Sequence, residues 1–204
     1  SVFSQVATKD TRSIEQKDDP YSIYNASNIN KITLLKALEI AGINIFNISL
    51  KKFDKKYHLE ITLDEYIDTR KVSSKNISVS TNNEYSYYRK NKRQISYIDH
   101  IDIFSRDIDS LSILKIETYA GSLNGIKLKQ NKNRKNQFYN WRTFGKTNWV
   151  LNENIPILVY ASSWYDKEND IERFCGAVDL SKNEDDTKML LGNSPHYYLI
   201  SYKV

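Results

Sequence analysis

The hydrophobic pattern changes its period early in the chain. Over NKITLLKALEIAG, apolar residues that include Leu34, Leu35 and Leu38 recur at helical spacing, which predicts an α-helix that begins near Asn30. Gly42 follows this segment, as expected of a residue that can enter the left-handed conformation at which helices end. Beyond Gly42 the spacing of apolar residues falls to two, the period of a strand.

Short stretches with this alternation recur down to the C-terminus, as in strands with one buried face. They are INIFNISL, YHLEITL, QISYIDHIDIF, LSILKIET, GIKLKQ, QFYNWRTF, IPILVYASSW, RFCGAVDL and YYLISYKV. Residues 53–56 (FDKK) separate the first two and suit a hairpin turn, and Asn124-Gly125 is a second hairpin signal. IPILVYA is apolar on both faces, which predicts a central strand that is covered on each side.

Many short strands with turns between them and one early helix predict a mainly β (α+β) fold, an antiparallel β-sandwich-like core. Residues 1–29 are polar, carry both charges and show no sustained period, so we expect a disordered tether there and a single domain over residues 30–204. No stretch approaches the ~20 apolar residues of a membrane span.

The first residue of the chain gives evidence on the cellular compartment of the protein. The only methionine is Met189, so Ser1 is not a translation start, and we expect that a signal peptide, a lipoprotein leader or another segment was removed. This favours an exported protein, periplasmic or associated with the outer membrane, whose only membrane contact is the removed anchor. The single cysteine cannot form an internal disulfide and decides nothing about the compartment.

That cysteine, Cys175 in ERFCGAV, is a candidate nucleophile. A catalytic thiolate needs a base or a helix N-terminus, and Arg173 and His196 could approach it. No helix start and no local cysteine-protease motif surrounds Cys175, and free cysteine is among the most often buried residue types. We therefore interpret Cys175 as structural, and keep a cysteine-dependent hydrolase that uses Cys175 and His196 as the alternative.

Other chemical patterns are weaker. His100 shares a strand face with Asp102, which could orient its ring. The acidic stretch 166–172 (DKENDIE) offers oxygen ligands for calcium but lacks the EF-hand spacing and its glycine, so we interpret it as a solvated hairpin loop. HExxH, paired CxxC, GxSxG, P-loop and GxGxxG motifs are absent, and the sequence predicts neither a metal site nor a cofactor.

The strongest surface signal is local charge. The chain carries +5, whereas residues 118–152 carry seven Lys and Arg and no acidic residue, which leaves −2 for the rest. Aromatic residues are interleaved with these cations, so one strand face could present an aromatic platform beside basic side chains. The expected ligand-binding residues are Arg134, Tyr139, Trp141 and Arg142. A second basic cluster, residues 85–93 (YSYYRKNKR), could extend the same face.

Such a surface suits a glycan, and its cations favour acidic or sulfated sugars. It also suits single-stranded nucleic acid, although export argues against that ligand. A third interpretation places the aromatics in the core beside a solvated basic loop. The sequence favours a non-enzymatic binding or structural module whose partner is a glycan or an envelope protein.

Four segments, LEITLDEYID, IPILVYASSW, ERFCG and NSPHYYLI, resemble in order and spacing a family of uncharacterised proteins (a domain of unknown function) from Bacteroides and related gut bacteria. The resemblance spans residues 30–204. It implies an exported or envelope-associated protein of a Gram-negative bacterium, and it implies no catalytic residues.

Overall fold

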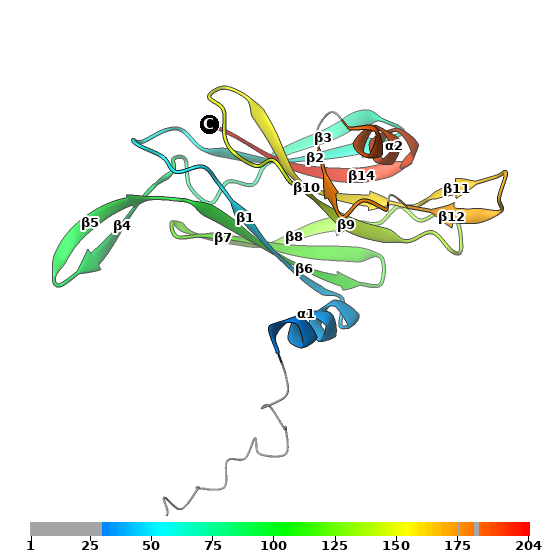
Figure 1. The fold of residues 1–204 in the computed structure, drawn as a ribbon, viewed down its shortest axis with the longest axis horizontal. Coiled ribbons are helices and arrows are strands. Elements are labelled where there is room, and N and C mark those ends of the chain that lie inside the picture. The colour runs from blue at the N-terminus through cyan, green and yellow to red at the C-terminus, as the bar shows by residue number, and fades with distance from the viewer. Residues whose placement is uncertain (1–29, 175, 182–183) are drawn as a thin grey trace, which may run out of the picture.

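Two β-sheets pack face to face in the computed structural model, which describes residues 30–174, 176–181 and 184–204 (Figure 1). Nearly all neighbouring strands are antiparallel, and strand is the dominant element. The predicted mainly β, sandwich-like class is therefore confirmed. The predicted tether, residues 1–29, lies outside the described residues.

The smaller sheet has four strands in the order β1-β6-β7-β8. They are β1 (Ile43–Ser49), β6 (His100–Ile108), β7 (Leu111–Thr118) and β8 (Gly121–Lys129). Gly125, with φ 77°, is the extra residue where the β7–β8 register shifts, and the hairpin turn lies instead at residues 119–120. The hairpin predicted at Asn124-Gly125 is thus wrong. A β-bulge, like a tight hairpin turn, needs a residue in the left-handed conformation, so the same sequence signal fits both.

The larger sheet has six strands in the order β13-β9-β10-β14-β2-β3. They are β2 (Glu60–Ile67), β3 (Arg70–Asn76), β9 (Tyr139–Phe144), β10 (Asn154–Ser162), β13 (Asp179–Leu180) and β14 (His196–Lys203). Strand β10 lies between β9 and β14, and its residues 157–161 are fully buried, as predicted for IPILVYA. Among the described strands, only the short β13–β9 pair is parallel.

The inner faces of the two sheets share one hydrophobic core. Ile61 and Leu63 of β2 and Ile101 and Ile103 of β6 are at most 4% exposed and belong to it. Each such side chain stabilises the fold by about 1.5–3 kcal/mol on burial. The hairpin predicted at residues 53–56 is wrong, because β1 and β2 lie in different sheets and the chain crosses between them there.

Two helices lie on the outer sides of the sandwich (Figure 1). Helix α1 (Lys31–Ile40) is confirmed, with Asn30 Oδ1 accepting from the Thr33 N–H (2.9 Å), yet none of its residues is buried. Helix α2 (Asp185–Asn193) was not predicted. It covers the outer face of the six-stranded sheet, where Leu190 is fully buried, and its main sequence signal is an acidic first turn.

Two short ribbons complete the fold. Strands β4 (Glu84–Arg89) and β5 (Lys92–Tyr97) form one that projects from the body at the left of Figure 1. Strands β11 (Trp164–Asp166) and β12 (Ile171–Arg173) form the other, which confirms a hairpin loop within residues 166–172. RFCGAVDL is not one strand as predicted, since residues 174 and 176–178 lie between β12 and β13.

Candidate functional site

The rings of Tyr139 and Trp141 lie between the two sheets. They are 9% and 5% exposed, and Trp141 stacks on Tyr160 with ring centroids 4.4 Å apart and contacts Phe46. Phe144, on the opposite face of β9, is buried with Leu190 of α2. The rings of Tyr139 and Trp141 therefore belong to the core and not to an exposed strand face.

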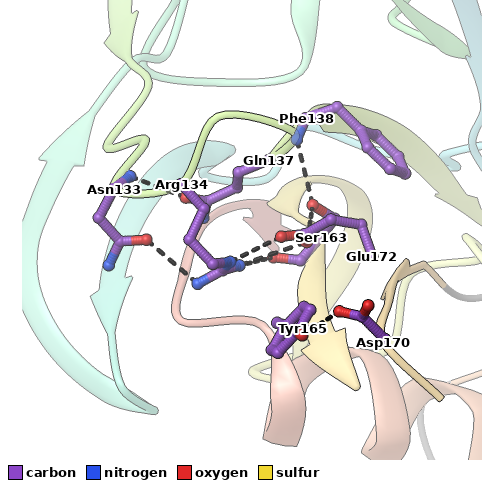
Figure 2. A network of polar contacts seen from close by, with 8 residues as sticks. All are labelled: Asn133, Arg134, Gln137, Phe138, Ser163, Tyr165, Asp170 and Glu172. Carbon is purple, nitrogen blue, oxygen red and sulfur yellow. Dashed lines mark hydrogen bonds and ion pairs between the residues drawn. The ribbon is translucent and has the colours of Figure 1, made fainter. Parts of the chain in front are cut away.

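Arg134 is fixed by internal contacts (Figure 2). Its Nε donates to Glu172 Oε1 (2.6 Å), while Nη2 donates to Glu172 Oε2 and to the Ser163 carbonyl (3.3 Å each). Nη1 donates to Asn133 Oδ1 (3.1 Å). The Arg134 hydrogen bonds lower the pKa of the Glu172 carboxyl below its usual value. Arg134 thus ties its loop to the β11–β12 ribbon.

Arg142 contacts different residues from those that Arg134 contacts. Its guanidinium lies over the Phe174 ring, 4.6 Å from the centroid, and Nη1 donates to the Trp141 carbonyl (2.8 Å). The four residues expected to bind a ligand therefore do not form a shared exposed surface.

His196 is 2% exposed, and both of its ring nitrogens are used. Nδ1 lies 2.7 Å from Tyr139 Oη, and Nε2 lies 3.2 Å from Glu65 Oε1. The other member of the proposed dyad, Cys175, lies outside the described residues.

A row of aromatic rings, exposed at Tyr87 and Tyr119 and partly buried at Tyr85 and His100, runs instead from the β4–β5 ribbon to the β7–β8 turn. We call Tyr87, Tyr85, Tyr119 and His100 the tyrosine row. Successive ring centroids lie 6.0, 5.1 and 4.7 Å apart, with Tyr85 stacked on Tyr119. Tyr87 is 41% and Tyr119 58% exposed, so these rings can meet a ligand without any change in the core.

The hairpin register places this row beside basic residues. Tyr87 pairs with Gln94 and Arg89 with Lys92, so Tyr85, Tyr87, Arg89 and Lys92 share one face of the ribbon. The two turn residues between Arg89 and Lys92 both have positive φ, as in the tight turns that match strand twist.

Tyr88 and Arg93 pair with each other on the opposite face of the ribbon, and Tyr88 is 78% exposed. None of the four cations at the ribbon tip forms an ion pair with a described residue. These cations are Arg89, Lys90, Lys92 and Arg93. The tip is therefore a cluster of uncompensated positive charge beside exposed rings.

The other end of the row is acidic. His100 Nδ1 lies 2.7 Å from Asp99 Oδ1, and Nε2 lies 3.4 Å from Asp102 Oδ2, so the predicted pairing with Asp102 is present. Asp102 also accepts from Asn47 Nδ2 (2.6 Å). The run YSYYRKNKR is visible in the sequence, but its contact with Tyr119 and His100 is not. Strand pairing in the folded chain brings those two residues next to it.

Comparison with protein-family models matches residues 13–204 to "Domain of unknown function (DUF5041)". The chain belongs to this family. The DUF5041 match spans every described strand and helix and begins within the segment predicted to be a tether. Searches of curated proteins and of solved structures find no match to the chain. The resemblance seen in the sequence is confirmed as far as membership of a family of unknown function. The origin in Bacteroides or a related bacterium and the export of the protein stay predictions.

Two further observations concern the described part of the DUF5041 domain. None of its helices is long and apolar enough to cross a membrane. Within residues 30–174, 176–181 and 184–204, no group of three or more His, Cys, Asp and Glu side chains is placed to hold a metal ion.

Proposed function

We propose that the DUF5041 domain is a non-enzymatic glycan-binding module. Its ligand lies along the tyrosine row, with an acidic substituent at the ribbon tip. The observation that carries this proposal is the row itself: Tyr119, Tyr85 and Tyr87 follow one another in contact, and the row leads to Arg89 and Lys92. Aromatic faces bind the apolar faces of sugar rings, and unpaired cations bind sulfate or carboxylate.

The acidic end of the row favours a glycan over nucleic acid. Asp99 and Asp102 flank His100, which contacts Tyr119 edge to face. A phosphate at every nucleotide would bring like charges together there, which is unfavourable. Sugar hydroxyls would instead donate hydrogen bonds to these carboxylates, so a glycan with its acidic group at one end matches both ends of the row.

The direct test is calorimetric titration of the full chain with sulfated, uronic-acid and neutral oligosaccharides and with single-stranded DNA, at low and near-physiological salt. We expect an acidic oligosaccharide to bind best. Tyr87→Ala and Tyr119→Ala should each weaken that binding about tenfold, since stacking of one ring on an aromatic side chain contributes about 1–3 kcal/mol in nucleic-acid complexes.

The ribbon supplies its own control. Tyr88→Ala alters the opposite face and should leave the affinity unchanged, whereas Arg89→Gln should weaken it. Equal losses from Tyr87→Ala and Tyr88→Ala would contradict a ligand on the row. Tight DNA binding whose affinity falls steeply with salt would assign the surface to nucleic acid instead.

A further inference from the structure

We propose that a cleft between β3 and β8 binds a small zwitterion, such as a free α-amino acid, with Glu65 facing its ammonium group and Lys75 its carboxylate. The cleft has a volume of about 320 Å³, near the lower end of ligand pockets, and shares no lining residue with the tyrosine row. This site is therefore independent of the glycan proposal.

The strand register brings the polar groups of this cleft together. β3 and β8 are edge strands of the two sheets, and the cleft lies between them. Lys75 lies opposite Leu63, and Ser73 opposite Glu65. Because Leu63 is buried in the core, its neighbours on that face, Glu65, Ser73 and Lys75, also face the space between the sheets.

A hydrogen-bonded chain from the interior holds one oxygen of Glu65. The Asn131 N–H donates to Tyr139 Oη (2.8 Å), which lies 2.7 Å from His196 Nδ1. Burial raises the pKa of Tyr139 to about 12, so its hydroxyl keeps its proton at neutral pH. His196 Nε2 lies 3.2 Å from Glu65 Oε1. The polar contacts from Asn131 to Glu65 are therefore continuous.

Tyr198 completes the environment of Glu65. Its Oη donates to Glu65 Oε1 (2.9 Å) and accepts from the Lys129 N–H (3.2 Å), which joins β14 to the edge of β8. Glu65 Oε2 accepts no hydrogen bond from the described residues, and the side chain is 29% exposed. Glu65 is thus a carboxylate whose orientation is set from the core and whose second oxygen is available.

The opposite charges of the cleft are unpaired. Lys75 lies diagonally across from Glu65 on the same face of the sheet, and the two form no ion pair with each other. An α-amino acid carries both complementary charges on groups attached to one carbon and would bridge these two side chains. The backbone of Lys127, two residues before Lys129, faces the same cleft and adds a donor and an acceptor.

The test uses L-alanine, L-glutamine and L-phenylalanine as probes of the full chain, with ethylamine and propionate as analogues that each carry one charge. At about 10 mM, roughly ten times a Kd of ~1 mM, the amino acids should raise Tm and shift the amide resonances of Ser73 and Lys127. The analogues should bind at least tenfold more weakly. Neutral monosaccharides should give no shift at these amides.

Lys75→Met decides the proposal, because Lys75 is exposed and unpaired and its loss leaves the fold intact. It should weaken amino-acid binding at least tenfold, as should Glu65→Gln. Lys115→Met and Glu117→Gln, an ion pair outside the cleft, are the matched controls and should have no effect. The proposal is overturned if no amino acid binds, if Lys75→Met binds as the wild type does, or if the shifted amides belong to the tyrosine row.

Discussion

At the scale of single residues, burial separates the aromatic side chains that can meet a ligand from those that cannot. Trp141 directly precedes Arg142 in the sequence, and Tyr87 lies two residues before Arg89. Trp141 is 5% exposed, with its ring stacked on Tyr160, whereas Tyr87 is 41% exposed beside unpaired cations. Which ring is buried depends on the strand that pairs with each, so composition alone cannot decide it.

Arg134 and Glu172 give a prediction at the same scale. Glu172→Gln should lower the free energy of unfolding at pH 7 by about 1–2 kcal/mol, because Arg134 and Ser163 lose a charged acceptor. The folded-state pKa of Glu172 lies below its unfolded value. Its contribution is therefore complete above the unfolded pKa and is lost as pH falls through the folded pKa.

Urea unfolding at pH 7 and at about pH 3.5 measures this contribution. The difference in the free energy of unfolding between wild type and Glu172→Gln should be smaller at the lower pH. Glu168→Gln, in the exposed loop of the same ribbon, is the control and should change little. A gap that stays constant with pH would show that Glu172 acts through packing rather than charge.

At the scale of elements, sequence patterns located secondary structure better than they located its partners. The first helix and the buried strand β10 follow from period and capping, which are local properties. Residues 53–56 and Asn124-Gly125 have turn-like sequences, yet the chain crosses between sheets at one and forms a bulge at the other. Pairing is a long-range choice, and local turn chemistry does not determine it.

The same limit explains the candidate sites. Basic and aromatic residues over 85–93 are visible in the sequence, but their contact with Tyr119 arises because the β4–β5 ribbon meets the β7–β8 turn. The cleft at Glu65 is harder still to predict from the sequence, since it combines residues from β2, β3, β8 and β14. Helix α2 was missed because its hydrophobic stripe is short and its burial comes from the sheet beneath it.

The β2–β3 turn gives a prediction at this scale. Asp68 and Thr69 have φ of 46° and 66°, and a β-branched residue is strained in this region. Thr69→Gly should raise the free energy of unfolding by about 0.5–1 kcal/mol, since the relieved strain exceeds the backbone entropy that glycine loses. Thermal and urea unfolding measure the change. Thr69→Ala keeps the positive φ without glycine's freedom, so a gain of equal size from it would contradict this account.

At the scale of the whole molecule, the two sheets depend on one core. Side chains from both inner faces belong to the same buried cluster, and Trp141 of the six-stranded sheet contacts Phe46 of the four-stranded sheet. Neither sheet covers its own apolar face, so the sheets should gain and lose stability together. The tyrosine row and the cleft then sit on a single framework, and each can be altered at exposed residues without disturbing the core.

Trp141→Ala tests that dependence. Removing a buried tryptophan leaves a cavity, and we expect the free energy of unfolding to fall by about 3–5 kcal/mol. Amide exchange should then accelerate by a similar factor at Ile103 in β6 and at Leu158 in β10, one in each sheet. Trp164→Ala, at the partly buried start of β11, is the control and should lower the free energy of unfolding by less. Retained protection at Ile103 would mean that the four-stranded sheet folds without the other, because its amides would then open independently of the damaged core.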